Sequence, residues 1–188
     1  TSANFGNMFS MAVASLVLPF MPLLPIQILL NNFLSDLPAF GIASDNVDPE
    51  LMTKPEGWNL RTIKRFMVVF GLQSSLFDFA TFVLLYFVFA AGEQAFRTAW
   101  FTESLLTEIL ILLVIRTRRS LFQSKPSAYL VVATLCTFAV AIVLPYLPFA
   151  YVVALYPLPF HLILAILLIT FLYIVFAEHT KRFLFRRM

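Results

Sequence analysis

The feature that most constrains the fold is a succession of long apolar runs separated by short polar breaks. Six such runs occur, over residues 3–18, 25–42, 63–91, 99–115, 128–145 and 160–177. Hydrophobic residues make up 61% of the chain and charged residues only 12%, whereas a soluble domain needs about 25% charged residues. Most of the runs are near the minimum of about 17 residues that crosses a bilayer as a helix. The sequence therefore predicts an all-α, polytopic membrane helical bundle with six transmembrane helices.

The polar breaks are too short to hold a further domain, so residues 1–188 are predicted to form a single membrane domain. Residues 1–42 would form a helix hairpin, and residues 63–177 would supply the supporting helices. The first run covers only about 24 Å of a hydrocarbon core about 30 Å thick. We therefore expect the chain to begin partway through a helix. A signal peptide is a poorer interpretation, because no basic region precedes the run and Asn4 and Asn7 interrupt it.

Basic residues predict the orientation in the membrane. All 13 Lys and Arg residues except Arg97 lie between the second run and the first residues of the third run, in the break after the fourth run, or after the sixth run. These three places are on one side of a six-helix bundle, and the positive-inside rule makes that side cytoplasmic. Both termini are then cytoplasmic as well. The net charge of +3 indicates contact with anionic lipid headgroups and not with nucleic acid.

Soft-metal and redox chemistry find no support in the sequence. Cys136 is the single cysteine, so the chain cannot form an internal disulfide. No Cys/His cluster has the spacing of a zinc site. His161 and His179 are far apart in the sequence and are expected at opposite faces of the membrane, where interfacial roles are the simplest interpretation.

Oxygen-bearing side chains interrupt the first two apolar runs. Helical spacing of three and four places Asn4 with Asn7 on one face of the first helix, and it groups Asn32, Ser35 and Asp36 on one face of the second. The short connection over residues 19–25 predicts that the two helices are antiparallel neighbours whose polar faces meet near the middle of the membrane. A buried charge such as the Asp36 carboxylate is costly there, so a functional site is the default hypothesis.

Proline strengthens this hypothesis. Pro38 has no N–H and crowds the carbonyl four residues earlier, so the Leu34 carbonyl is expected to be free to face a ligand. Carboxylate, amide, hydroxyl and carbonyl oxygens form a hard ligand set that suits Mg²⁺, Ca²⁺ or Na⁺, and one carboxylate among neutral oxygens favours Mg²⁺. The simpler alternative is that the amides and hydroxyls join helices by hydrogen bonds.

Further acidic residues fall in or beside the later runs. Glu108 is a candidate third-helix ligand, a countercharge, or a protonated hydrogen-bonding group. Glu103 is placed near the outer boundary, where it could reach water. Asp78 lies in the middle of the third run, where a buried structural hydrogen bond is the favoured interpretation. The acidic segment 45–50 is expected to be a solvated turn.

Several segments together resemble a known family. NFGN at residues 4–7, NFLSDLP at 32–38 and DNVD at 45–48 resemble the fifth and sixth transmembrane helices of P-type cation-transporting ATPases. SSLFD at 74–78 and IRTRR at 115–119 resemble the bacterial magnesium-transporting branch. The resemblance covers essentially the whole chain, which would correspond to the fifth to tenth helices of such a pump.

The resemblance implies a metal site and a transport reaction. Its ligands would be Asn4, Asn7, Asn32, Ser35 and Asp36, with Glu108 matching an acidic residue of the eighth helix in related calcium pumps. Asn7 stands where those pumps have a glutamate, which favours one divalent ion, Mg²⁺, over two calcium ions. Transport would be inward, across the cell's inner or plasma membrane, and driven by ATP hydrolysis through an aspartyl-phosphate.

The chain departs from a complete pump in what it lacks. It contains no DKTGT phosphorylation motif and no nucleotide-binding segment. We therefore expect it to be inactive alone and to need the first four helices and cytoplasmic domains of the same pump as its partner. Alternatives are a stand-alone channel or secondary cation carrier, a calcium- or proton-transporting P-type ATPase, and a non-transporting assembly domain. A complete carrier should show an internal repeat, and no second copy of the Pro-interrupted pattern is present.

Overall fold

The computed structural model describes residues 2–46, 48, 60–121 and 123–186. Their α-helices are α1 Ser2–Val17, α2 Pro25–Ala39, α4 Leu60–Val83, α5 Glu93–Ile115, α6 Ala128–Val143 and α7 Phe160–Arg186. Shorter turns of 3-10 or π-helix are η1 Phe40–Ser44, η2 Leu84–Val88, η3 Leu144–Tyr146 and η4 Ala150–Val153. The described residues contain no strand. The all-α prediction with six helices is therefore confirmed.

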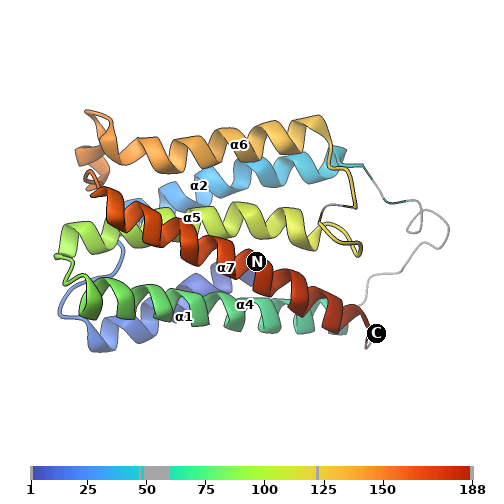
Figure 1. The fold of residues 1–188 in the computed structure, drawn as a ribbon, viewed down its shortest axis with the longest axis horizontal. Helices are drawn as coiled ribbons and strands as arrows, with labels where there is room; N and C mark the ends of the chain where they lie inside the picture. Colours follow the sequence, from blue (N-terminus) through green and yellow to red (C-terminus); the bar gives the residue numbers. More distant parts are fainter. Residues whose placement is uncertain (1, 47, 49–59, 122, 187–188) are drawn as a thin grey trace.

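The helices lie side by side as a bundle with α5 at its centre. Figure 1 shows α2 and α6 along one side of α5, α1 and α4 along the other, and α7 crossing in front. α5 packs closely against α7, α2, α6 and α4. Every residue from Thr98 to Thr107 is buried. An apolar helix that is covered on all sides belongs in the interior of a large bundle, and the polar residues on α5 must therefore find partners inside the protein.

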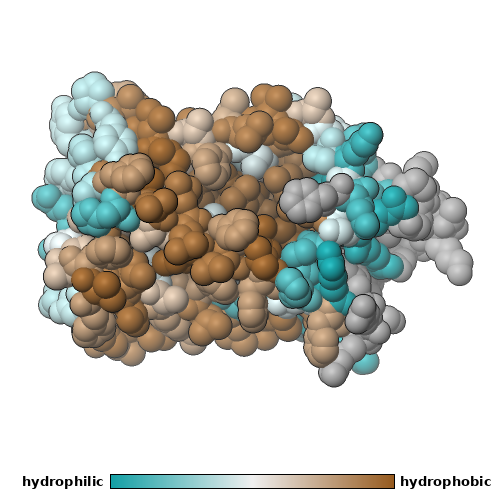
Figure 2. Space-filling view, in the orientation of Figure 1, coloured by the Kyte–Doolittle hydropathy of each residue, from teal (hydrophilic) through white to brown (hydrophobic). Residues whose placement is uncertain are grey.

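The outer surface is that of a membrane protein. On the face drawn in Figure 2, a wide apolar band crosses the middle of the molecule, with hydrophilic residues at its two ends. Four segments of the described chain are long and apolar enough to cross a membrane: Ile63–Val88, Glu93–Ile115, Ala128–Tyr146 and Phe160–Leu184. α1 and α2 are shorter, with 16 and 15 residues. Together with the exposed Phe and Leu side chains of α7, this arrangement makes the chain an integral, multi-pass membrane protein.

Helix ends extend beyond the predicted apolar runs where charges are paired. α5 begins at Glu93, six residues before the predicted start, and Glu93 forms an i,i+4 ion pair with Arg97 in its first turns. α7 continues past residue 177 because Lys181 is buried and hydrogen-bonded at the end of α5. Hydropathy predicts that an apolar helix ends at a charged residue, but a helix can continue through a charged residue whose side chain is paired. Of the predicted loop residues, Glu50 and Lys54 lie outside the described residues.

The packing of the first two helices differs from the expected hairpin. α1 packs on α4, and α2 packs on α5 and α6. α1 with α2 is not among the closely packed helix pairs of the described residues, and Figure 1 shows α1 and α2 on opposite sides of α5. The short connection makes the two helices consecutive in the chain, but each packs on other helices, and cavities lined by residues of both lie between them. Their polar faces consequently do not press directly against each other.

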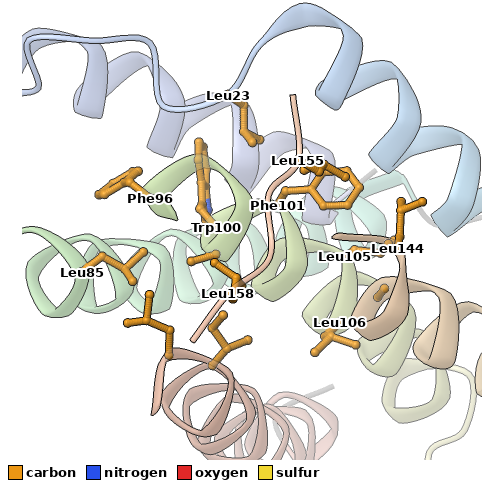
Figure 3. Close-up of a cluster of buried hydrophobic side chains, with 14 of the residues drawn as sticks. Leu23, Leu85, Phe96, Trp100, Phe101, Leu105, Leu106, Leu144, Leu155 and Leu158 are labelled. Carbon is orange, nitrogen blue, oxygen red and sulfur yellow. The ribbon is translucent and has the colours of Figure 1, made fainter. Parts of the chain in front are cut away.

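Tight packing fixes the rotation of these helices about their axes. A Cβ atom on Gly6 would lie 2.8 Å from the Gly71 carbonyl oxygen of α4, so the α1–α4 crossing requires glycine at that position. Around α5, Leu23, Leu85, Phe96 and Trp100 belong to one buried apolar cluster (Figure 3). This cluster holds α5 against the elements on either side and sets which of its polar residues meet α1, α2 and α4.

Candidate metal site between α1, α2 and α5

The polar residues of α2 form two neighbouring stripes that have different surroundings. Gln27, Asn31 and Ser35 are spaced by four residues and are all buried. Asn32 and Asp36 form the next stripe; Asn32 is half-buried and Asp36 is exposed. The first stripe therefore faces the centre of the bundle. The second stripe, Asn32 and Asp36, faces towards α1, with which α2 is not closely packed.

One cavity brings together most of the predicted ligands. It has a volume of about 310 Å³ and is lined by Asn4 of α1, Ser35 and Asp36 of α2, and Glu108 of α5. Apolar side chains from α1, α2, α4 and α5, with Tyr173 of α7, complete the lining. Asp36 and Glu108 are close enough to act on each other electrostatically. Two carboxylates, a hydroxyl and an amide thus border one space large enough for a partly hydrated cation.

The remaining predicted ligands border a second cavity. Its volume is about 210 Å³, and Asn7, Asn31 and Asn32 line it with Asn4. Asn4 therefore borders both cavities. Apart from these amides, the lining of the second cavity is apolar and includes Met8, Met11 and Trp100. The second cavity contains no carboxylate among its described lining residues, so its chemistry is that of neutral oxygens beside the charged first cavity.

Asn31 contacts Glu108 directly, although it is not among the ligands predicted from the sequence. Its amide nitrogen donates a hydrogen bond of 2.8 Å to Glu108 Oε2, and the residue is only 3% exposed. The other amide atom, Asn31 Oδ1, is buried without a hydrogen-bond partner among the described residues. The i,i+4 relation of Asn31 to Ser35 was a signal for this role, but the prediction selected its neighbour Asn32.

Glu103 and Asp78 belong to a separate buried cluster. Glu103 was expected near the outer boundary, and that expectation is wrong, because it is 1% exposed in the centre of the bundle. Asp78 accepts a hydrogen bond of 2.6 Å from Ser10 of α1 and one of 3.0 Å from the indole nitrogen of Trp100. The structural hydrogen bonds predicted for Asp78 are therefore present.

The acidic segment after η1 is not the solvated turn that was expected. The Asp45 carboxylate accepts from Arg116 Nη1 at 2.6 Å and from the backbone N–H of Ser127 at 2.7 Å. Asp48 accepts from the hydroxyls of Thr117 and Ser124 and is 8% exposed. These carboxylates bind the end of η1 to the loop between α5 and α6, so the basic segment after α5 holds elements together as well as defining orientation.

The pKa of the Asp48 carboxyl is lowered by these contacts. Burial raises the pKa, but the hydrogen bonds from Thr117 and Ser124 and the positive charges of Arg119 and Arg116 outweigh that effect. Asp48 is therefore ionised at neutral pH and belongs to a structural network. The described residues contain no group of three or more His, Cys, Asp or Glu side chains placed to hold a metal ion, so a cation in the first cavity would depend on neutral oxygens as well as on Asp36 and Glu108.

Comparison with known proteins identifies relatives that span the same helices. The Magnesium-transporting ATPase, P-type 1 of Escherichia coli K12 is 45% identical over 152 residues, which cover 78% of this chain and 17% of that protein. A protein of the same name from Salmonella typhimurium LT2 is 36% identical over 191 residues, covering 99% of this chain and 21% of its own length. The chain thus spans about a fifth of the length of these relatives.

A more distant relative carries a different cation in its name. The Calcium-transporting ATPase of Bacillus subtilis 168 is 27% identical over 155 residues, covering 78% of this chain and 17% of that protein. Residues 20–183 match the family described as Cation transporting ATPase, C-terminus, and this range includes α2, α4, α5 and α6 entirely. The chain therefore belongs to the family of C-terminal membrane regions of cation-transporting ATPases.

Proposed function

We propose that this chain is the ion-binding membrane part of an ATP-driven pump that transports Mg²⁺. The observation that carries the proposal is the cavity in which Asp36, Glu108, Ser35 and Asn4 converge from three helices. Carboxylate and neutral oxygen ligands match the preference of Mg²⁺. The relatives at 45% and 36% identity are named as magnesium-transporting ATPases, which agrees with this ligand chemistry.

In this proposal the charged and the neutral residues have different roles. Asp36 and Glu108 supply negative charge, and Ser35 and Asn4 supply neutral oxygens beside them. Asn31 orients Glu108 through its 2.8 Å hydrogen bond and leaves its own buried Oδ1 as a further acceptor. Asn7 and Asn32, which border the adjacent cavity, would coordinate the ion as it enters or leaves. A ligand that is held by a second side chain binds a metal more tightly because its orientation is fixed in advance.

The energy for transport would come from outside the helices described here. The relatives extend far beyond the aligned region, and we assign ATP hydrolysis and phosphorylation to that part of the pump. The exposed Asp36 carboxylate marks the side of the cavity where further helices of the same protein would complete the site. Anionic lipid headgroups would contact the basic residues at the cytoplasmic end.

The test is Mg²⁺-stimulated ATP hydrolysis by the intact protein that carries this sequence. Asp36→Asn and Glu108→Gln are each expected to raise the Mg²⁺ concentration for half-maximal stimulation by roughly 10–100-fold, because each removes a ligand charge. Glu93→Gln is the matched control, since Glu93 pairs with Arg97 at the outer end of α5 and lies outside the cavity.

Two outcomes would contradict the proposal. If Asp36→Asn and Glu108→Gln both behave like Glu93→Gln, the cavity is not the ion site. If Ca²⁺ stimulates hydrolysis at lower concentration than Mg²⁺ does, and the same two variants abolish that response, the site belongs to a calcium pump instead. The distant calcium-transporting relative makes this the alternative to be measured in parallel.

A further inference from the structure

Asp78 and Glu103 form a buried acidic pair that is separate from the candidate cation site. Asp78 of α4 and Glu103 of α5 are each 1% exposed, and their carboxyl groups interact directly with each other. They lie among the apolar residues of the core, beside Trp100, which is labelled in Figure 3. Two carboxylates in contact inside a membrane protein repel each other, and each also loses its hydration.

The two carboxyl groups have very different hydrogen-bond partners. Both oxygens of Asp78 accept a hydrogen bond, Oδ2 from Ser10 and Oδ1 from Trp100. Neither oxygen of Glu103 receives a hydrogen bond from any donor of the described residues. Donors stabilise a negative charge, so Asp78 is the member of the pair that is built to be ionised. Glu103 has nothing among those donors to compensate a charge.

The other helices add no positive charge that could hold both groups ionised. Ser10 faces the pair from α1, and Tyr173 of α7 lies near enough to be affected by both carboxyl groups and by Glu108. No Lys, Arg or His of the described residues is among the groups that act on either carboxyl. A single proton shared by the two groups removes the repulsion, because only one charge remains. It also supplies the hydrogen bond that Glu103 lacks.

We propose that Asp78 and Glu103 form a proton-binding site in which Glu103 carries the proton and its O–H donates a hydrogen bond to the ionised Asp78. Filling the site forms an O–H bond on one Glu103 oxygen, and the proton comes from hydronium in the solvent, which is left as water. The new O–H then donates a hydrogen bond to an Asp78 oxygen. A metal ion is disfavoured there, because Ser10 and Trp100 direct hydrogen atoms at the Asp78 oxygens. The site joins α1, α4 and α5, so gaining or losing its proton changes the contact between these helices.

Infrared spectroscopy of the intact protein tests the site directly. A protonated carboxylic acid has a carbonyl stretching band that carboxylates lack and that shifts in heavy water. We expect this band at neutral pH and expect Glu103→Gln to remove it, whereas Glu93→Gln, at an ion-paired and half-exposed site, leaves it unchanged. The amide group that Glu103→Gln introduces can still donate to Asp78, so this variant should fold. Glu108→Gln is recorded separately so that any band from Glu108 can be subtracted.

A second measurement needs no change at either carboxyl. Carbon-13 labelling of the glutamate carboxyl groups in the Glu108→Gln protein should shift the band, and labelling of aspartate should leave it in place. A band that follows labelled aspartate, or no band at all, overturns the assignment. Loss of the Glu103 band on addition of Mg²⁺ alone would show that the pair binds a cation and would overturn it too. None of these outcomes depends on ATP hydrolysis, so they are independent of the transport proposal.

Discussion

At the scale of single residues, one step along a helix separates very different roles. Asn31 and Asn32 are adjacent and chemically identical, but Asn31 is buried against Glu108 and Asn32 is half-buried at the neighbouring cavity. Glu103 and Glu108 lie on the same helix, and Glu103 meets Asp78 whereas Glu108 faces α2. A rotation of about 100° per residue is enough to send consecutive side chains to different neighbours.

Gly6 gives a prediction at this scale. Its missing side chain lets α1 approach α4, where Ser75 Oγ donates to the Gly6 carbonyl at 3.1 Å. In Gly6→Ala the new Cβ would lie 2.8 Å from the Gly71 oxygen and 2.9 Å from Ser74 Cβ. We expect the free energy of unfolding to fall by about 1–3 kcal/mol, the usual cost of overpacking. Thermal unfolding in detergent measures this change.

The control for this prediction is another glycine of the same chain. A Cβ atom on Gly92 would meet nothing within 4 Å, so Gly92→Ala should cost less than about 1 kcal/mol, because the reduced freedom of the unfolded chain offsets part of alanine's weaker N-cap preference. Equal unfolding temperatures for the two variants would show that α1 and α4 are not in the close contact described here.

At the scale of elements, buried charges connect helix ends that are distant in the sequence. Lys181 of α7 is fully buried and donates to the carbonyls of Val114 and Arg119, at 3.0 and 2.8 Å. It also pairs with Glu178 at 2.8 Å. The carbonyl groups at the end of a helix lack partners within the helix, and here a lysine from another helix supplies one. Asp45 performs a comparable role at the start of α6.

Asp48 gives a pH-dependent prediction for this end of the bundle. Because its folded pKa lies below the ordinary value of 3.8, its stabilising contribution is complete above that value and is lost as the pH falls through the lowered folded pKa. Asp48→Asn should therefore lower the free energy of unfolding by about 1 kcal/mol at neutral pH, because charged hydrogen bonds to Thr117 and Ser124 become neutral ones. The difference between the two proteins should shrink below pH 3.8.

Thermal unfolding of both proteins over a pH series provides the measurement. The difference between the two proteins in free energy of unfolding is compared at each pH, so that the contribution of all other acidic groups cancels. A constant difference from neutral to acid pH would mean that the Asp48 charge does not stabilise the loop. Glu93→Gln, at an exposed ion pair, should show a much smaller difference throughout.

At the scale of the whole molecule, the two ends of the bundle have different compositions. The end that carries the loop between α5 and α6 and the end of α7 holds Arg116, Arg119, Lys181 and Arg182. The opposite end, with η3 and η4, has no Lys or Arg between Leu144 and Phe160. This asymmetry runs along the long axis in Figure 1, and by the positive-inside rule it predicts that the basic end is cytoplasmic.

Cysteine labelling tests this orientation. In a Cys136→Ala background, Tyr151→Cys should react with a membrane-impermeant maleimide in intact cells, because Tyr151 is 69% exposed at the outer end. Gln123→Cys, exposed at the basic end, should react only after the membrane is permeabilised. The reverse pattern would invert the orientation, and labelling of both in intact cells would contradict a bundle in which these loops lie on opposite sides.

The sequence by itself determined the class of the protein, its helices and several of the polar residues that line the first cavity. Hydropathy and helical spacing are properties of a single segment, so the all-α bundle and the shared cavity residues Ser35 and Asp36 could be predicted from it. The family resemblance, confirmed by the match over residues 20–183, required only the order of residues along the chain.

Only the tertiary structure decided which helices meet and which face each one presents. The sequence placed α1 against α2, whereas α1 packs on α4 and α2 on α5 and α6. It also placed Glu103 near the outer boundary, although this residue faces Asp78 in the core. The physical reason is that helix rotation and pairing are fixed by side-chain packing between segments far apart in the chain, such as Gly6 against Gly71.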